Sequence, residues 1–244
     1  HPALRATLPA RGRDRCGEGL ITIMDINLTP ILTSWPFLLK ALGMTIFVSV
    51  MSTALGFVIG TLVGALRTYG GRSVNIVLGF YVDSMRAIPL LVILVWAFFA
   101  FPLLIGMSIN AVTAGIAGLG LHLGAYVSET IRAGLTSVRR NQMQAALALG
   151  MSRIQAIRTI ILPQAIIRML PALGSLFVIA IKDSAIASVI AVPELLRQPQ
   201  IVAGKTFRPF ELYTAAMLAY FILCYPVARC FDRLYRRFSH LGSS

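Results

Sequence analysis

Charged side chains are scarce in this sequence. Only 13% of its 244 residues are Asp, Glu, Lys or Arg, whereas 57% are hydrophobic. Soluble domains carry about 25% charged residues, so the composition excludes a soluble globular domain and predicts an integral membrane protein. Acidic residues are fewer than basic ones, 9 against 22. The net charge of +13 does not indicate nucleic-acid binding, because the basic residues lie between apolar stretches and not on one solvated face.

Cysteine and histidine are equally few. The three cysteines and three histidines are Cys16, Cys224, Cys230, His1, His122 and His240. Their spacing matches neither a zinc site nor a disulfide framework. The sequence VAGKTF at 202–207 ends like a phosphate-binding loop, but Pro199 stands where its first glycine should be, and no strand precedes it. We therefore expect this chain to bind no metal, cofactor or nucleotide itself.

The first 23 residues differ from those that follow. They contain four arginines and lack an apolar run long enough for the core of a signal peptide. Met24 then begins the apolar part of the chain. We expect residues 1–23 to be a non-native or disordered extension, and residues 24–244 to form one transmembrane domain.

Long apolar runs fill that domain. A bilayer core about 30 Å thick needs about 20 apolar residues in a helix, and residues 41–66 and 87–128 contain no Asp, Glu, Lys or Arg. We predict an all-α fold with about five transmembrane helices. The second should bend around Pro89, whose ring removes a backbone donor. The predicted spans are about 38–66, 77–103, 110–133, 170–192 and 209–231.

Basic residues are unevenly divided between the two sides of these spans. The regions 67–86, 132–168 and 229–237 place thirteen arginines on one side, whereas 101–110 holds no basic residue and 193–208 holds three. Lys and Arg accumulate in cytoplasmic connections. We therefore expect the C-terminus in the cytoplasm and the N-terminus outside.

The cytoplasmic connection at 136–165 is basic and amphipathic. Its apolar residues recur in steps of three and four, as on one face of a helix: Met143, Leu147, Gly150, Ile154, Ile157 and Ile161. A connector that lies on the membrane surface would show the same pattern. Periodicity alone does not separate that alternative from a face that docks on another protein.

A motif inside this connection is more specific. In QAALALGMSRIQAIRTIILP, residues 144–163, the triplet Gln144-Ala145-Ala146 precedes Gly150 by three residues, and an Ile-x-Leu-Pro sequence follows after nine more. This spacing resembles the Glu-Ala-Ala loop of permease subunits of bacterial ATP-binding-cassette importers. Gln144 departs from the acidic residue of that pattern.

Further blocks extend the resemblance over residues 36–235. DSMRAIPLL (83–91), AYVSETIRAGLTSV (125–138), LPQAIIRMLPALG (162–174) and KDSAIASVI (182–190) are similar to blocks of the polar amino-acid importer branch. The resemblance implies the type I importer permease fold in a bacterial plasma membrane. It also implies a chain that is no enzyme itself.

The resemblance further implies that 136–165 forms short coupling helices seated on a separate ATPase subunit, which would bind ATP and Mg. Small side chains allow close approach, and a glycine can break a helix. The coupling residues would be Gln144, Ala145, Ala146 and Gly150. The other implied partners are an identical or similar permease subunit, a periplasmic or lipid-anchored solute-binding protein, the amino-acid substrate and membrane lipid.

Charged residues within or near the spans are candidates for the substrate pathway, because an unpaired charge is costly in hydrocarbon. These candidates are Arg86, Glu129, Lys182 and Asp183. Adjacent helical positions point about 100° apart, so we expect Lys182 and Asp183 to have different neighbours. The alternative for Glu129 is a local ion pair with Arg132, three residues away, and Asp83 can pair with Arg86 in the same way.

Glycines spaced four apart predict close helix packing. They are Gly56, Gly60 and Gly64 in the first span and Gly120 and Gly124 in the third.

Two other classes of function stay open from the sequence. A secondary transporter would be expected to contain internal repeats, and no block recurs here. A non-conducting membrane assembly subunit is the second alternative. Among polar amino acids, the stretch RAIPLLVILVWAFFAFP (86–102) slightly resembles permeases for acidic substrates, and the same branch also carries basic and amide ones.

Overall fold

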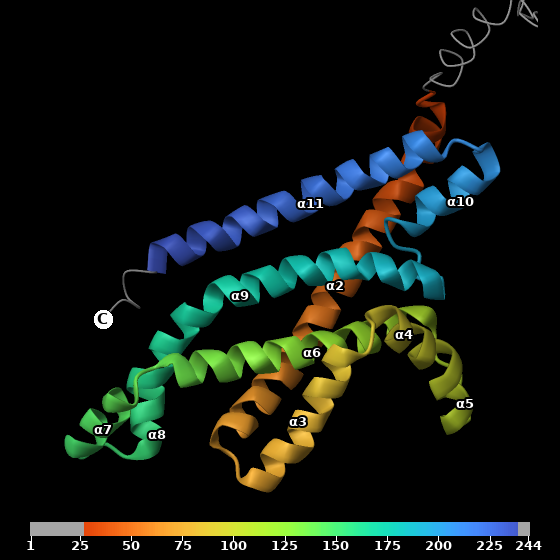
Figure 1. Ribbon diagram of the computed structural model, residues 1–244. Coiled ribbons are helices and arrows are strands. Elements are labelled where there is room, and N and C mark those ends of the chain that lie inside the picture. The colour runs from red at the N-terminus through yellow and green to blue at the C-terminus, as the bar shows by residue number, and fades with distance from the viewer. Residues whose placement is uncertain (1–26, 239–244) are drawn as a thin grey trace, which may run out of the picture.

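The computed structural model describes residues 27–238, and helices account for nearly all of them (Figure 1). No strand occurs within this described range. Four helices are long and apolar enough to cross a membrane, and a bent pair makes a fifth if its two arms count as one span. The predicted all-α fold is confirmed. The expected extension, residues 1–23, lies outside the described residues.

The first long helix, α2 (Thr29–Tyr69), crosses α6 (Ala111–Ser137) in the middle of the bundle (Figure 1). Glycine lets the two backbones approach closely. A Cβ atom on Gly60 would lie 2.5 Å from the Cβ of Val127, a separation that real side chains do not tolerate. The glycine steps predicted from the sequence therefore place α2 directly against α6.

The second predicted span, 77–103, bends at Pro89 as predicted, and the bend is a sharp break between two arms. Its first arm, α3, begins earlier than predicted and covers Arg72–Ala87, and the second arm leaves it at 104°. Ile88 between them is extended, at φ −85° and ψ 131°, because the ring of Pro89 disfavours the helical conformation of its predecessor. The second arm consists of α4 (Leu90–Val95), a π-helical turn (Trp96–Ala100) and α5 (Phe101–Ile105).

The fourth long helix is longer than the predicted span 170–192. Helical structure continues from Arg153 to Ile190. It consists of α8 (Arg153–Ala156), a π-helical turn (Ile157–Ile161), α9 (Leu162–Asp183) and a 3-10 segment (Ser184–Ile190). The π-helical turn ends just before Pro163, where the proline ring removes one hydrogen bond of the α-helical ladder. Part of the predicted loop thus belongs to the long helix.

The last two helices are α10 (Arg197–Thr206) and α11 (Pro209–Phe238). Helix α11 lies along α9 at the edge of the bundle (Figure 1). Only 6% of its most apolar window is buried inside the molecule, against 56% for α6. Helix α6 therefore forms the centre of the bundle, and α11 is the most exposed of its long helices.

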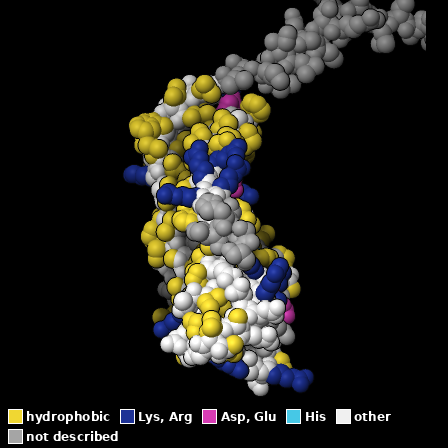
Figure 2. Space-filling model, turned by 90° about the vertical axis from the view of Figure 1, so that its left-hand side faces the viewer, with side chains coloured by type: hydrophobic (Ala, Val, Ile, Leu, Met, Phe, Trp, Pro, Cys, Tyr) yellow, Lys and Arg dark blue, Asp and Glu magenta, His cyan; other side chains and the backbone are white. Residues whose placement is uncertain are grey.

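The molecule has two distinct ends. Helix α7 (Arg140–Ala148), α8 and the last turns of α11 lie at one end, and α5 and α10 lie at the other (Figure 1). The first end also carries the 69–72 connection. We call it the arginine-rich end. Figure 2 looks at this end and shows Lys and Arg side chains gathered beneath an apolar upper region.

Candidate functional site

One face of α6 is polar and only partly buried. Its members follow one another in steps of three and four, so they lie on the same side of the helix. They are His122, Tyr126 and Glu129, which we call the α6 stripe, and each is half-buried. At 1.5 Å per residue the α6 stripe extends over about 10 Å. The other side of α6 is buried in the core through Leu123, Val127 and Ile131.

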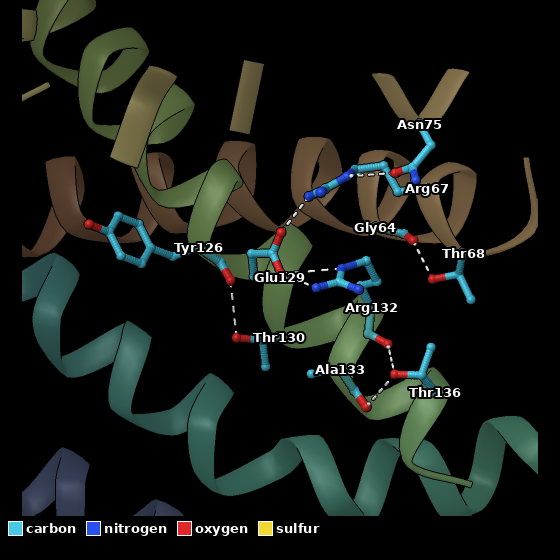
Figure 3. Close-up of polar contacts among 10 residues, drawn as sticks. All are labelled: Gly64, Arg67, Thr68, Asn75, Tyr126, Glu129, Thr130, Arg132, Ala133 and Thr136. Atoms are coloured by element: carbon cyan, nitrogen blue, oxygen red, sulfur yellow. Dashed lines mark hydrogen bonds and ion pairs between the residues drawn. The ribbon is translucent and has the colours of Figure 1, made fainter. Parts of the chain in front are cut away.

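Glu129 ends the α6 stripe between two guanidinium groups (Figure 3). Arg67 of α2 donates a hydrogen bond to Oε1, and Arg132 donates to Oε2 at 3.2 Å from Nε and 2.8 Å from Nη2. Arg67 also donates to the side chain of Asn75 on α3, at 3.4 Å. The predicted Glu129–Arg132 pair is present, and Arg67, only 10% exposed, extends it into a network that joins α2, α3 and α6.

A cavity of about 490 Å³ adjoins Glu129 between α6 and α9. Arg168 of α9 forms part of its wall and donates a hydrogen bond to the backbone carbonyl of Ser137 at 2.6 Å. The full lining is Glu129, Thr130, Ala133, Gly134, Ser137, Arg168, Met169 and Ala172. The α6 stripe therefore opens, toward the arginine-rich end, into a cavity of the size that holds a small solute.

Arg86, at the end of α3, lies beside the middle of the α6 stripe. Its guanidinium carbon is 5.5 Å from the centre of the Tyr126 ring, a distance at which a cation is attracted to the ring face. The predicted Asp83–Arg86 pair is wrong, since the described residues include no ion pair between them. Arg86 turns toward the aromatic ring of α6 instead of its own helix.

Asp183 and Lys182 have different neighbours, as expected for adjacent helical positions. Asp183 is close enough to His122 for an electrostatic interaction with that imidazole, and the His122 and Tyr126 rings are 5.1 Å apart. Lys182 instead lines two hollows between α9 and α11, of about 310 and 250 Å³. The structure thus brings Arg86, Glu129 and Asp183 to the α6 stripe, whereas Lys182 lies on the side of α9 that borders α11.

His122 and Tyr126 are not among the site residues predicted from the sequence. The three histidines are scattered along the chain, but His122 stands seven residues before Glu129 with Tyr126 between them. That helical spacing was the available signal. The Nδ1 atom of His122 is buried without a hydrogen-bond partner among the described residues.

A second missed residue is Glu194, which is fully buried in the connection between the 3-10 segment and α10. Its carboxylate accepts hydrogen bonds from the backbone N–H groups of Leu196 and Arg197, at 2.9 and 2.8 Å, and from the Tyr220 hydroxyl. The backbone N–H of Leu195, directly after Glu194, donates a hydrogen bond to the Thr45 hydroxyl. Burial raises the pKa of Glu194 above its ordinary value of 4.5. These bonds tie the connection to α2 and α11.

The predicted coupling segment forms a tight turn between α7 and α8. Gly150 has φ +82°, a left-handed conformation that favours glycine. Ser152 then caps α8 through a reciprocal pair of hydrogen bonds with Gln155. Leu149 and Ile154 are 82% and 64% exposed. The predicted helix break at Gly150 is therefore present. The turn exposes apolar side chains at the arginine-rich end.

Two expectations about this segment are corrected. The apolar residues do not form one face, because the break at Gly150 leaves Leu147 and Ile154 exposed while Met143 and Ile157 pack on the core. Ala146 is not available for contact, being only 1% exposed. Gln144, Ala145 and Gly150 are exposed.

The geometry can be compared with known proteins. Residues 56–240 match the family described as "Binding-protein-dependent transport system inner membrane component". This chain belongs to that family. The glutamine transport system permease protein GlnP of Escherichia coli K12 is 36% identical over 215 residues, which cover 88% of this chain and 98% of the relative. The probable amino-acid permease YckA of Bacillus subtilis is 35% identical over 88% of this chain and 94% of its own length.

Solved structures agree with the sequence relatives. A crystal structure of an amino acid ABC transporter with histidines superposes with a TM-score of 0.81 at 33% identity, over 88% of this chain and 100% of the other. The methionine transporter MetNI in an inward-facing form gives 0.73 at 21% identity, over 84% and 97%, which supports the fold alone. The chain thus has the type I importer permease fold.

Membership of this permease family decides the broad class of the protein. Its relatives are transport subunits of ABC importers whose ATPase is a separate subunit, so the chain is a permease and no enzyme. The secondary-transporter and assembly-subunit alternatives are therefore not supported. Among the described residues, no group of three or more His, Cys, Asp or Glu could hold a metal ion.

Proposed function

We propose that the α6 stripe lines the path along which this permease moves a polar amino acid. The main support for the proposal is that the polar surface is continuous. His122 and Tyr126 are followed along α6 by Glu129, which lines the same cavity as Arg168. A continuous polar surface on a central helix is costly against lipid. A second permease subunit, identical or similar, would enclose it.

Arg86 and Asp183 carry opposite charges on two edges of the α6 stripe. Every free amino acid has a carboxylate and an ammonium group, which a guanidinium and an acid bind by charge-assisted hydrogen bonds. Glu129 already accepts from two arginines, so its role is to hold the path's walls together. Lys182 lines the hollows toward α11 and has no direct place in this path.

The substrate side chain is an amide or an acid of glutamine size. The amide is favoured because GlnP proteins, named for glutamine transport, are similar over nearly their full length. His122 and Tyr126 are also hydrogen-bonding groups that suit an amide. The acidic preference suggested by residues 86–102 is the second candidate.

The turn at Gly150 is the coupling element of this proposal. Exposed Leu149 and Ile154 fit an apolar cleft of the partner ATPase, which would bind ATP and Mg. A periplasmic or lipid-anchored solute-binding protein would deliver substrate at the opposite end, near α5 and α10. The arginine-rich end is then cytoplasmic in a bacterial plasma membrane, with the N-terminus outside.

ATP-dependent uptake by the full complex in proteoliposomes tests the path. Competition by each of the twenty amino acids should identify glutamine or glutamate. Asp183→Asn and Arg86→Gln should raise KM for uptake, whereas the matched controls Asp83→Asn and Arg72→Gln, exposed on α3, should not. Unchanged KM in both path variants would contradict the proposal.

A further inference from the structure

The outer side of α11 carries an apolar band followed by arginines. The band residues are between 49% and 68% exposed and lie on one side of the helix: Met217, Leu218, Phe221, Ile222 and Tyr225. The same side continues toward the arginine-rich end with three basic residues in steps of four and three: Arg229, Arg233 and Arg236. We call these eight residues the α11 outer face.

The inward side of α11 has different contacts. Phe231 packs against Gly174 of α9, where a Cβ atom would lie 2.6 Å from its ring. Tyr220 donates to the buried carboxylate of Glu194. These contacts fix the rotation of α11, so the α11 outer face is turned away from the rest of the chain except at Met217, which also borders the hollow beside Lys182.

The junction between the apolar and basic parts is a formed hollow of about 430 Å³. The Tyr225 ring stacks on Phe221, with centroids 5.4 Å apart and planes at 25°. The Arg229 guanidinium lies over the same Tyr225 ring at 5.2 Å, which holds this charge next to the apolar band. The lining is Tyr225, Pro226, Arg229, Asp232, Arg233 and Arg236. Asp232 offsets one of the three positive charges, and the hollow stays cationic.

We propose that the α11 outer face binds an anionic phospholipid, with its phosphate at Arg229 and Arg233 and an acyl chain along Phe221 and Ile222. The dimensions agree. Met217 and Arg229 are about 18 Å apart along the helix at 1.5 Å per residue, and the hydrocarbon of one leaflet is about 15 Å deep. Guanidinium groups bind phosphate through paired N–H donors.

Charge argues against a second copy of the chain on this face. A two-fold axis along the membrane normal brings residues of equal depth together. Arg229 and Arg233 would then meet their own counterparts, and like charges repel. A phosphate has the opposite charge, which favours the lipid as occupant.

The purified permease complex is equilibrated in detergent with equal parts of phosphatidylglycerol and phosphatidylcholine, and retained lipid is measured by native mass spectrometry. Wild type should retain phosphatidylglycerol in preference. Replacing Arg229 and Arg233 by Gln should lower that preference by about tenfold or more, since each basic residue near the surface contributes to anionic-lipid binding. Replacement by Lys should keep part of it, because the positive charges remain but the paired donors do not.

The matched control changes Arg72 and Arg139 to Gln, which removes two exposed charges from the same end but not from α11. It should retain the preference. Equal retention of the two lipids by wild type, or equal loss in both Gln pairs, would overturn the proposal whether or not the Gln variants fold well. A disulfide between two copies carrying Ile222→Cys, in a background without Cys16, Cys224 and Cys230, would assign the face to a second subunit.

Discussion

Glu129 of α6 accepts a hydrogen bond from Arg67 of α2, although 62 positions separate them in the chain. The bond joins the two helices that cross at the centre of the bundle. Arg132 shares the same carboxylate, so removal of Glu129 leaves two cations without their acid.

Glu129→Gln should therefore destabilise the permease. We expect the free energy of unfolding to fall by about 2 kcal/mol. Breaking a fully buried pair costs more, about 3–5 kcal/mol, but 23% of the Glu129 side chain is exposed. Thermal unfolding of the detergent-solubilised protein measures this. The double variant with Arg67→Met should lose less than the sum of the single losses. Strict additivity would show that the two groups do not interact.

Ala145 and Ala146 provide a matched pair for the coupling turn. Ala146 is buried and Ala145 is exposed. Ala146→Glu should unfold the α7–α8 turn, because it inserts a charge into a packed site. Ala145→Glu should leave the melting temperature unchanged and still weaken ATPase binding. Co-purification of the ATPase measures its binding, and thermal unfolding measures the melting temperature. Full ATPase binding by Ala145→Glu would remove this surface from the contact.

Gly150 tests the turn through its backbone. At φ +82° a β-branched residue is strained by about 1–2 kcal/mol, so Gly150→Val should reduce both ATPase co-purification and coupled uptake. Gly150→Asn should be tolerated better, because Asn adopts the left-handed conformation more readily. Should Val and Asn behave alike, the left-handed turn has no part in coupling.

Leu149 tests the apolar contact independently of the turn. Its side chain is 82% exposed, so Leu149→Ser should leave folding unchanged. Loss of a buried apolar anchor in the complex should weaken ATPase binding by about tenfold or more. Titration of purified ATPase onto the permease measures the change, and undiminished affinity would refute an apolar docking contact.

Glu194 predicts a pH dependence of stability. Because burial raises its pKa in the folded chain, the folded state binds this proton more tightly than the unfolded state. The stabilisation is complete below the unfolded pKa and is lost as pH rises through the folded one. The melting temperature of wild type should thus fall relative to Glu194→Gln as pH increases above 4.5. Parallel curves for the two proteins would contradict this assignment.

Composition and helical period were sufficient for the fold class and for much of the bundle. A low charge content and long apolar runs leave few options besides membrane helices, because backbone polar groups in lipid must bond within their own segment. The glycine steps predicted close packing of α2 and of α6 without naming their partners, and the spacing around Gly150 predicted the break before α8. These features are local, so a single sequence contains them.

The site depended on contacts that no local pattern contains. Arg67 meets Glu129, and Arg86 meets Tyr126, only because the bundle brings α2 and α3 against α6. Ala145 and Ala146 are both alanines, yet packing buries Ala146 and leaves Ala145 exposed. Glu194 reads as an ordinary loop acid until α11 places Tyr220 beside it. Helical period states which residues share a face; only tertiary packing decides what that face touches, because the partners come from distant parts of the chain.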